Sequence, residues 1–170
     1  DSGQLMQAAS GLAGGQDMTG HVLSGTPHFC IGAACDPGAK DMAVEAQKCQ
    51  AKIKLGAAFF QTQAVFELDV IKRFMSMARL LGKPVLAGIL FIKSAKQARY
   101  MNEHVWGIRV PEDIIARFEK ASDMRAECMA VASEFIRSVR DVVDGIHLYP
   151  LGWDDLVPDI LEASGIQAEP

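Results

Sequence analysis

Residues 56–67 read Gly-Ala-Ala-Phe-Phe-Gln-Thr-Gln-Ala-Val-Phe-Glu, and this stretch decides the fold. The apolar run from Gly56 to Phe60 predicts a buried strand, which delivers the side chains of Gln61, Thr62 and Gln63 together at its carboxyl end. Parallel α/β folds place their chemistry at this end of their strands. We therefore expect a functional site where the strand ends.

Short apolar runs alternate with helical patterns along the rest of the chain. The runs predict strands at residues 28–34, 56–60, 83–90 and 145–149. Spacings of three and four between apolar residues predict helices at residues 1–12, 40–55, 68–81, 95–104, 111–120, 123–143 and 154–164, with Pro111 as a first helical residue. Strands that alternate with helices in this way pair in parallel through right-handed crossovers.

The predicted fold class is α/β, with one domain over residues 1–170 and an extra helical region at about 95–143. Four strand–helix units are too few to close an eight-stranded barrel, which typically needs about 250 residues. The units form either a small open sheet or half of a (β/α)8 barrel. The polar side chains at the strand ends favour the half barrel.

Composition excludes several classes of function. The chain has 170 residues, of which 49% are hydrophobic, and this suits one domain with a sizeable core. The net charge is −4 and no basic run is present, so we expect no nucleic-acid partner. The longest apolar stretch, residues 84–92, is too short to span a bilayer. No signal peptide is visible, which predicts a cytoplasmic protein, and the start at Asp1 rather than Met indicates a missing preceding segment.

The four cysteines predict structural thiols rather than a metal site. They show no CxxC pairing and are read as reduced, cytosolic residues: Cys30, Cys35, Cys49 and Cys128. Cys30 and Cys35 could form a ligand pair, but the nearby His21 and His28 lack zinc-site spacing. No metal is therefore predicted.

Several segments, in their order and spacing, resemble methylenetetrahydrofolate reductase, a flavin-dependent (β/α)8 barrel enzyme. The resemblance covers nearly the whole chain and rests on these stretches: Asp1-Ser2-x-x-Leu5, Phe29 to Ala34 with Asp36-Pro37-Gly38-Ala39, Lys52-x3-Gly56-Ala57-x4-Thr62-Gln63-x2-Phe66, Pro84-Val85-x-Ala87-Gly88-Ile89, Asn102-Glu103-x3-Gly107-Ile108-Arg109-Val110-Pro111, and Gly145 to Tyr149. This similarity implies that the chain is the carboxyl-terminal half of the barrel.

The resemblance implies that FAD binds across the mouth of the barrel. Lys52 matches the lysine that meets the dinucleotide phosphates, and Glu45 matches an acidic contact on the same helix. A cation offsets the charge of a pyrophosphate in a partly desolvated groove. Lys48 stands where the family usually has a neutral amide, and Asp36 matches a position near the adenosine end.

The resemblance also implies a folate site. Gln63 and Gln97 match glutamines that contact the folate. An amide suits this role, because it presents a donor and an acceptor side by side to a pterin edge. Thr62 is expected to brace this site, and Tyr149 to point into the mouth. Met101 replaces a phenylalanine that stacks on the substrate or nicotinamide in some members, and Trp153 stands near an arginine that some members use for the glutamate tail. His147 is expected to be a hydrogen-bonded structural residue.

The activity implied is reduction of methylenetetrahydrofolate to methyltetrahydrofolate, a step of one-carbon metabolism that leads to methionine, with NADH, NADPH or a partner protein as the electron donor. The family's general acid, a glutamate after the first strand, is not in this sequence, so no catalytic residue is assigned to the chain. Unpaired strand edges favour association with the missing half, another copy or a partner subunit.

Two alternatives remain from the sequence. A non-catalytic half-barrel subunit that docks on a flavoprotein or corrinoid protein would accommodate Met101 and the absent acid. An unrelated flavin barrel is disfavoured, because the segments around Gln63 and Gly88 match in register. The main hypothesis expects Gln63 and Lys52 to project into one shared cavity.

Overall fold

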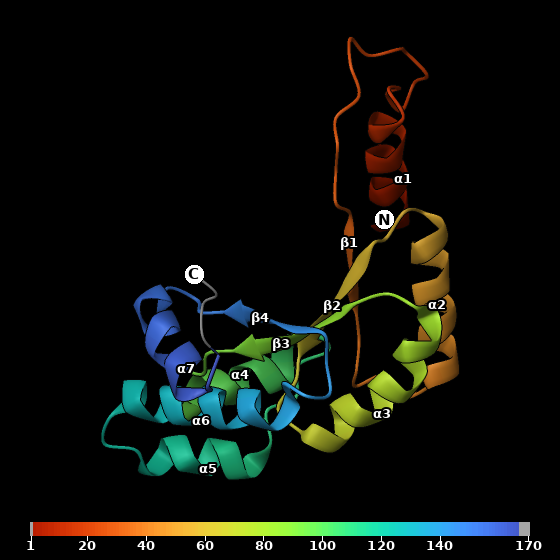
Figure 1. Cartoon of the computed structure of the whole chain (residues 1–170). Helices are drawn as coiled ribbons and strands as arrows, with labels where there is room; N and C mark the ends of the chain where they lie inside the picture. The colour runs from red at the N-terminus through yellow and green to blue at the C-terminus, as the bar shows by residue number, and fades with distance from the viewer. Residues whose placement is uncertain (1, 167–170) are drawn as a thin grey trace.

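A computed structural model describes residues 2–166 of the chain, so that Asp1 of the first motif lies outside the described residues. Four strands form one sheet in the order β1-β2-β3-β4: β1 (Gly32–Cys35), β2 (Phe59–Ala64), β3 (Val85–Leu90) and β4 (Gly145–Tyr149). All three neighbouring pairs are parallel (Figure 1). The predicted α/β class with parallel strand–helix units is confirmed.

The helices follow the strands in the predicted alternation. They are α1 (Ser2–Ala13), α2 (Met42–Lys54), α3 (Leu68–Ala78) with the short turn η1 (Arg79–Leu81), α4 (Ala95–His104), α5 (Glu112–Lys120), α6 (Met124–Val139), and the turn η2 (Asp154–Leu156) leading into α7 (Val157–Ala163). Helices α4 to α6 make up the predicted extra helical region between β3 and β4. None of the helices in residues 2–166 is long and apolar enough to cross a membrane.

Strand β2 corrects the sequence-based boundaries. It runs over Phe59–Ala64, not 56–60, and therefore contains the Gln-Thr-Gln triplet instead of ending before it. Gly56 has φ of +100° and belongs to the turn that ends α2, where its N–H meets the Ile53 carbonyl at 3.0 Å. Alternate residues of β2 are buried and half-buried, so the strand is not buried on both faces.

Other boundaries also differ. Strand β1 begins at Gly32 and not at residue 28, and α6 ends at Val139, since Val142 and Val143 already turn back onto its last carbonyl. Pro111 is the N-cap of α5 rather than its first helical residue. Its extended backbone, with ψ of 151°, lies outside the helical region.

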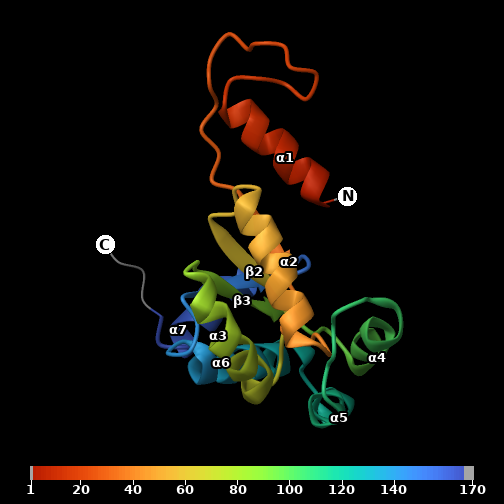
Figure 2. The ribbon, with the colours of Figure 1, turned by 90° about the vertical axis from the view of Figure 1, so that its right-hand side faces the viewer.

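The core lies between the sheet and the helices α2, α3 and α6. Phe60, Val85, Ile89, Phe74 and Ile136 are among its fully enclosed side chains. Figure 2 shows α2 and α3 covering one face of the sheet. The other face is less covered, and we call it the open face: it carries Phe59, Gln61 and Gln63 of β2 and His147 and Tyr149 of β4, all half-buried.

Helix α1 and residues 14–31 project from the amino end of β1, away from α4, α5 and α6 (Figure 1). The Ser10 hydroxyl donates to the Leu55 carbonyl at 2.6 Å and joins α1 to the end of α2. This arm lies at the opposite end of β1 from the residues that follow the strand. It therefore does not contribute to the site described next.

Candidate functional site

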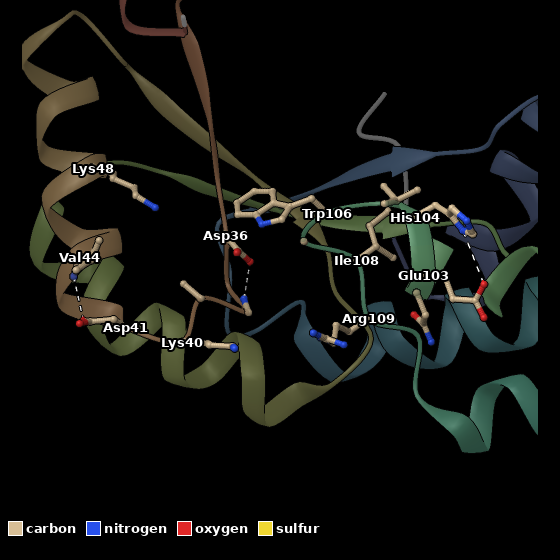
Figure 3. A pocket seen from close by; sticks show the side chains of 15 residues that line it. Asp36, Lys40, Asp41, Val44, Lys48, Glu103, His104, Trp106, Ile108 and Arg109 are labelled. Atoms are coloured by element: carbon tan, nitrogen blue, oxygen red, sulfur yellow. Dashed lines mark hydrogen bonds and ion pairs between the residues drawn. The ribbon is translucent and has the colours of Figure 1, made fainter. Parts of the chain in front are cut away.

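A cavity of about 570 Å³ lies between the β1–α2 connection and the α4–α5 loop (Figure 3). Its walls are formed by Asp36, residues 38–41, Val44 and Lys48 on one side and by residues 102–109 on the other. Three cationic side chains line it: Lys40, Lys48 and Arg109. The cavity is thus at the carboxyl end of β1, where a parallel sheet places its ligands.

Glu45 braces this end of β1. Its side chain is buried, with 2% of its surface exposed, and its Oε1 accepts the Asp36 N–H at 2.9 Å. Its Oε2 lies 3.4 Å from the ammonium of Lys48, whose side chain is 55% exposed. A buried carboxylate needs such partners to offset its lost hydration. Glu45 therefore lies behind the cavity wall and holds Lys48 at its edge.

Asp36 lines the cavity and is itself largely buried. Its Oδ1 accepts the Gly38 N–H at 2.8 Å, which shapes the turn after β1. Burial raises the pKa of the Asp36 carboxyl, the Gly38 hydrogen bond opposes that rise, and the nearby Glu45 charge adds to it. The residue can accept a hydrogen bond from a ligand in the cavity.

Lys52 is held elsewhere. Its ammonium donates to the Ala34 carbonyl of β1 at 2.6 Å, and it is not among the residues that line the cavity. Because β1 is an edge strand among the described strands, Lys52 supplies a donor to the backbone of that strand. Of the four residues assigned to the cofactor, Asp36 and Lys48 meet at the cavity, Glu45 supports them, and Lys52 lies along β1.

The open face carries neutral hydrogen-bonding groups. The Gln61 amide nitrogen lies 3.1 Å from Nδ1 of His147. This hydrogen bond connects β2 to β4 across β3. The His147 ring meets Tyr149 edge to face, with the centroids 4.4 Å apart. His147 is thus hydrogen-bonded, as expected from the sequence, but it is half-buried on the open face and not enclosed in the core.

Thr62 and Gly88 connect β2 to β3 at a bulge, where the pairing shifts between Gln61 and Ala64. The Thr62 hydroxyl accepts the Gly88 N–H at 2.9 Å and donates to the Gln63 carbonyl at 2.7 Å. The side chain therefore replaces backbone bonds that the bulge disrupts. Thr62 is 1% exposed, so its side chain supports the bulge and is not accessible to a ligand.

Gln63 lies between the open face and the cavity. Its side-chain carbons pack against Gly107, where an added Cβ would come within 3.0 Å of Cγ. Gly107 itself lines the cavity. Gln63 is not a lining residue, so Gln63 and Lys52 do not share this cavity: Gln63 reaches its wall through Gly107, whereas Lys52 is held on β1.

Gln97 and Met101 lie on α4. Ser94 caps this helix by accepting the Gln97 N–H at 3.1 Å, and Oε1 of Gln97 accepts the Lys93 N–H at 2.7 Å. This reciprocal pair resembles a capping box and leaves the amide nitrogen of Gln97 as the group that a ligand could meet. Met101 is half-buried and packs against the core, so it offers little surface to a ligand.

Comparison with known proteins identifies the family. The sequence model of the family described as methylenetetrahydrofolate reductase matches residues 4–165. The chain belongs to that family. No curated protein matched the sequence.

One solved structure supports the fold of this methylenetetrahydrofolate reductase family member. It is an uncharacterized protein from Clostridium thermocellum that binds two copies of 5-methyl-5,6,7,8-tetrahydrofolic acid. The two align with a TM-score of 0.60 at 14% sequence identity, over 82% of this chain and 55% of the other. The chain thus spans little more than half the length of that protein.

Sequence reasoning missed three residues that line the cavity of this family member: Lys40, Trp106 and Arg109. Arg109 belongs to a motif of the family resemblance, but the motif assigned it no role. The local cluster of His104, Trp106 and Arg109 around Gly107, directly after a helix, could have indicated the last two, whereas no comparable signal marks Lys40. Within residues 2–166, no group of three or more His, Cys, Asp or Glu side chains could hold a metal ion.

Proposed function

We propose that this chain supplies the carboxyl-terminal half of a (β/α)8 barrel that reduces methylenetetrahydrofolate to methyltetrahydrofolate with FAD. Membership of the methylenetetrahydrofolate reductase family supports it. So does the similarity in fold to a protein that binds 5-methyltetrahydrofolate. Strands β1 and β4 are the outer strands of the described sheet, where the strands of another half would pair.

The observation that carries the proposal is the adjacency of two surfaces at one end of the sheet. The open face offers amide and phenol groups from Gln63 and Tyr149, and a pterin edge presents matching donors and acceptors. The cavity beside it is lined by three cations and three carboxylates, and the cations without an ion pair among the described residues, Lys40 and Arg109, would meet the phosphates of a dinucleotide. Gly107 touches Gln63 and lines the cavity, so the two surfaces meet there.

The cavity residues fit the cofactor chemistry. Lys48 would meet the phosphates, Asp36 would accept a hydroxyl hydrogen bond, and Glu45 would keep Lys48 in place. Lys52 would reach the phosphates only by leaving its bond to the Ala34 carbonyl. Bound FAD supplies the hydride chemistry that side chains lack. The protein's part is to align the substrate ring through Gln63, Gln97 and Tyr149 and to exclude water from the mouth.

The proton for the departing nitrogen of the substrate would come from outside these strands. The open face, as far as the structure describes it, carries amide, imidazole and phenol groups but no carboxylate. The electron donor would be NADH, NADPH or a partner protein, and the unpaired strand edges favour an assembly. These features agree with a chain that completes its site by pairing with another half.

Titration of the purified chain with FAD and with 5-methyltetrahydrofolate tests the function. We expect saturable binding of both, with weak retention of flavin through purification and no turnover by residues 1–170 alone. If the chain binds neither FAD nor 5-methyltetrahydrofolate, the folate and flavin function is contradicted. Robust reductase activity from residues 1–170 alone would contradict the half-barrel assignment.

A second candidate is a non-catalytic half-barrel subunit that docks on a flavoprotein or corrinoid protein. Met101 in place of an aromatic ring and the lack of a carboxylate on the described open face favour it. A chain of this kind would bind no flavin itself. Gel filtration at high FAD concentration distinguishes the two candidates. Flavin absorbance that elutes with the chain supports the reductase half, and its absence supports the non-catalytic subunit.

A further inference from the structure

Trp106 is a cavity residue that no part of the family resemblance explains. It lies in the α4–α5 loop with 73% of its surface exposed, whereas an indole is a large apolar group that proteins usually cover. Single exposed apolar side chains are common on protein surfaces. Trp106 differs because it lines a concave cavity, and Figure 3 shows its indole extending into the space between α2 and the α4–α5 loop.

The loop that carries Trp106 is fixed at its base. Asn102 donates from its amide nitrogen to the Val110 carbonyl at 2.9 Å and accepts the Val110 N–H at 2.7 Å. The Asn102 side chain thus bonds both backbone groups of Val110 and ties together the two ends of the segment from Glu103 to Arg109. Gly107, with φ of +81°, packs against Gln63. The backbone around Trp106 is therefore held in place while its indole remains accessible.

Charges of both signs surround Trp106. Lys40, Lys48 and Arg109 line the same cavity, and so do the acidic residues Asp36, Asp41 and Glu103. Lys48 is paired with Glu45, whereas Lys40 and Arg109 form no ion pair among the described residues. These two cations are therefore available to the negative groups of a ligand that also meets Trp106.

We propose that Trp106 stacks on the planar heteroaromatic ring of an anionic ligand in this cavity, and so supplies the aromatic surface that Met101, half-buried against the core, does not offer. The proposal rests on the proposed function, which it deepens by naming the residue that covers the ring. Flavin, adenine and pterin rings share this chemistry, and FAD and folates both carry negative charge. The experiment separates the cofactor from the folate.

The chain has two tryptophans, so each can be studied alone. Trp153→Phe leaves Trp106 as the single indole, and Trp106→Phe leaves Trp153, which lies between Lys93 and Arg125. Each variant is titrated separately with FAD and with 5-methyltetrahydrofolate while indole fluorescence is recorded. Light absorption by the ligand is the same in both variants, so the difference between them reports how close the ligand lies to Trp106, and the affinity of Trp106→Ala reports contact.

We expect saturable quenching in Trp153→Phe with at least one ligand, and little in Trp106→Phe. Calorimetric titration should show that Trp106→Ala weakens that ligand roughly fivefold or more, because stacking of a base on an aromatic side chain is worth about that much. Trp106→Phe should keep the affinity within about threefold. Quenching by FAD alone assigns a ring of the cofactor, and quenching by 5-methyltetrahydrofolate alone assigns the pterin.

Two results would overturn the proposal. If both ligands bind the Trp153→Phe variant without quenching, and Trp106→Ala binds them as well as the parent chain, Trp106 does not stack and the proposed function still stands. If neither ligand binds the parent chain, the proposal and the proposed function both fail. Circular dichroism of Trp106→Ala checks folding, which the exposure of this residue leads us to expect unchanged.

Discussion

Tyr149 on β4 donates a hydrogen bond from its hydroxyl to the carbonyl oxygen of Thr62 on β2, at 3.2 Å, and its side chain crosses β3 over Gly88. The two residues are separated by 87 positions in the sequence. Crossing the intervening strand is possible because Gly88 has no side chain. This contact fixes Tyr149 on the open face, close to the bulge that places Gln63.

Replacement of Gly88 by alanine tests the crossing. A Cβ at this position would lie 2.7 Å from the Thr62 carbonyl oxygen and 3.0 Å from both the Gln63 carbonyl oxygen and a ring carbon of Tyr149. Two of these atoms are backbone and cannot move cheaply, so we expect Gly88→Ala to lower the free energy of unfolding by about 1–3 kcal/mol. Urea denaturation measures the change.

Gly11→Ala is the matched control for that variant. Gly11 lies within helix α1, and an added Cβ would meet only the Gln16 carbonyl oxygen at 3.5 Å, an ordinary contact. Alanine in a helix interior is favoured over glycine by roughly 0.5–1 kcal/mol. Equal stability of Gly88→Ala and Gly11→Ala would show that the Tyr149 crossing does not need a glycine.

Thr62 gives a second prediction, about the bulge. Thr62→Val keeps the shape of the side chain but leaves the Gly88 N–H without the hydroxyl acceptor. A buried donor without a partner costs about 1–3 kcal/mol, so Thr62→Val should be destabilised by that amount. Thr62→Ser retains the hydroxyl and should lose less. Thermal unfolding of the two variants compares them, and a valine variant as stable as the serine variant would contradict the role of the hydroxyl.

The order and type of the elements could be predicted from the sequence because the signals are local. The helix at 95–104 and the strand at 145–149 have the predicted limits, since Ser94 and the apolar run after Asp144 mark them clearly. The predicted limits of β2 were wrong, and the reason is also local. Gly56 ends α2 in a left-handed turn, and the period-two pattern of Phe59–Ala64, not the apolar run before it, marks the strand.

The site could be predicted only in part because its contacts are long-range. The Lys52 ammonium is bonded to a carbonyl of β1, and no sequence pattern states which backbone group a lysine will reach. Trp106 lines the cavity only because the α4–α5 loop, closed by Asn102 and Val110, lies opposite α2, and this placement is tertiary. The pairing of Gln61 with His147 joins residues 86 positions apart and has the same cause.

The two glutamines of β2 should behave differently when replaced by leucine. The Gln63 amide has no hydrogen-bond partner among residues 2–166, so Gln63→Leu should change the free energy of unfolding by less than about 0.5 kcal/mol. If Gln63 meets the pterin, this variant should bind 5-methyltetrahydrofolate about three- to tenfold more weakly, as expected for one lost hydrogen bond. Calorimetric titration measures the affinity.

Gln61→Leu is the companion variant. It removes the partner of His147 Nδ1 and should lower the free energy of unfolding by about 1 kcal/mol. Its effect on stability should therefore exceed that of Gln63→Leu. Unchanged affinity in Gln63→Leu, with a stable and folded protein, would remove Gln63 from the substrate site.

Cysteine reactivity gives a prediction that is independent of function. Cys30 is exposed, whereas Cys35, Cys49 and Cys128 are buried. Burial raises the pKa of Cys49 and Cys128 to about 11 and also raises that of Cys35, so these thiols carry little reactive thiolate at neutral pH. In the folded chain we expect a disulfide reagent to modify one thiol quickly at pH 8, and all four after denaturation. Cys30→Ser should abolish the fast phase, and a fast-reacting thiol that remains in that variant would show that one of the buried positions opens readily.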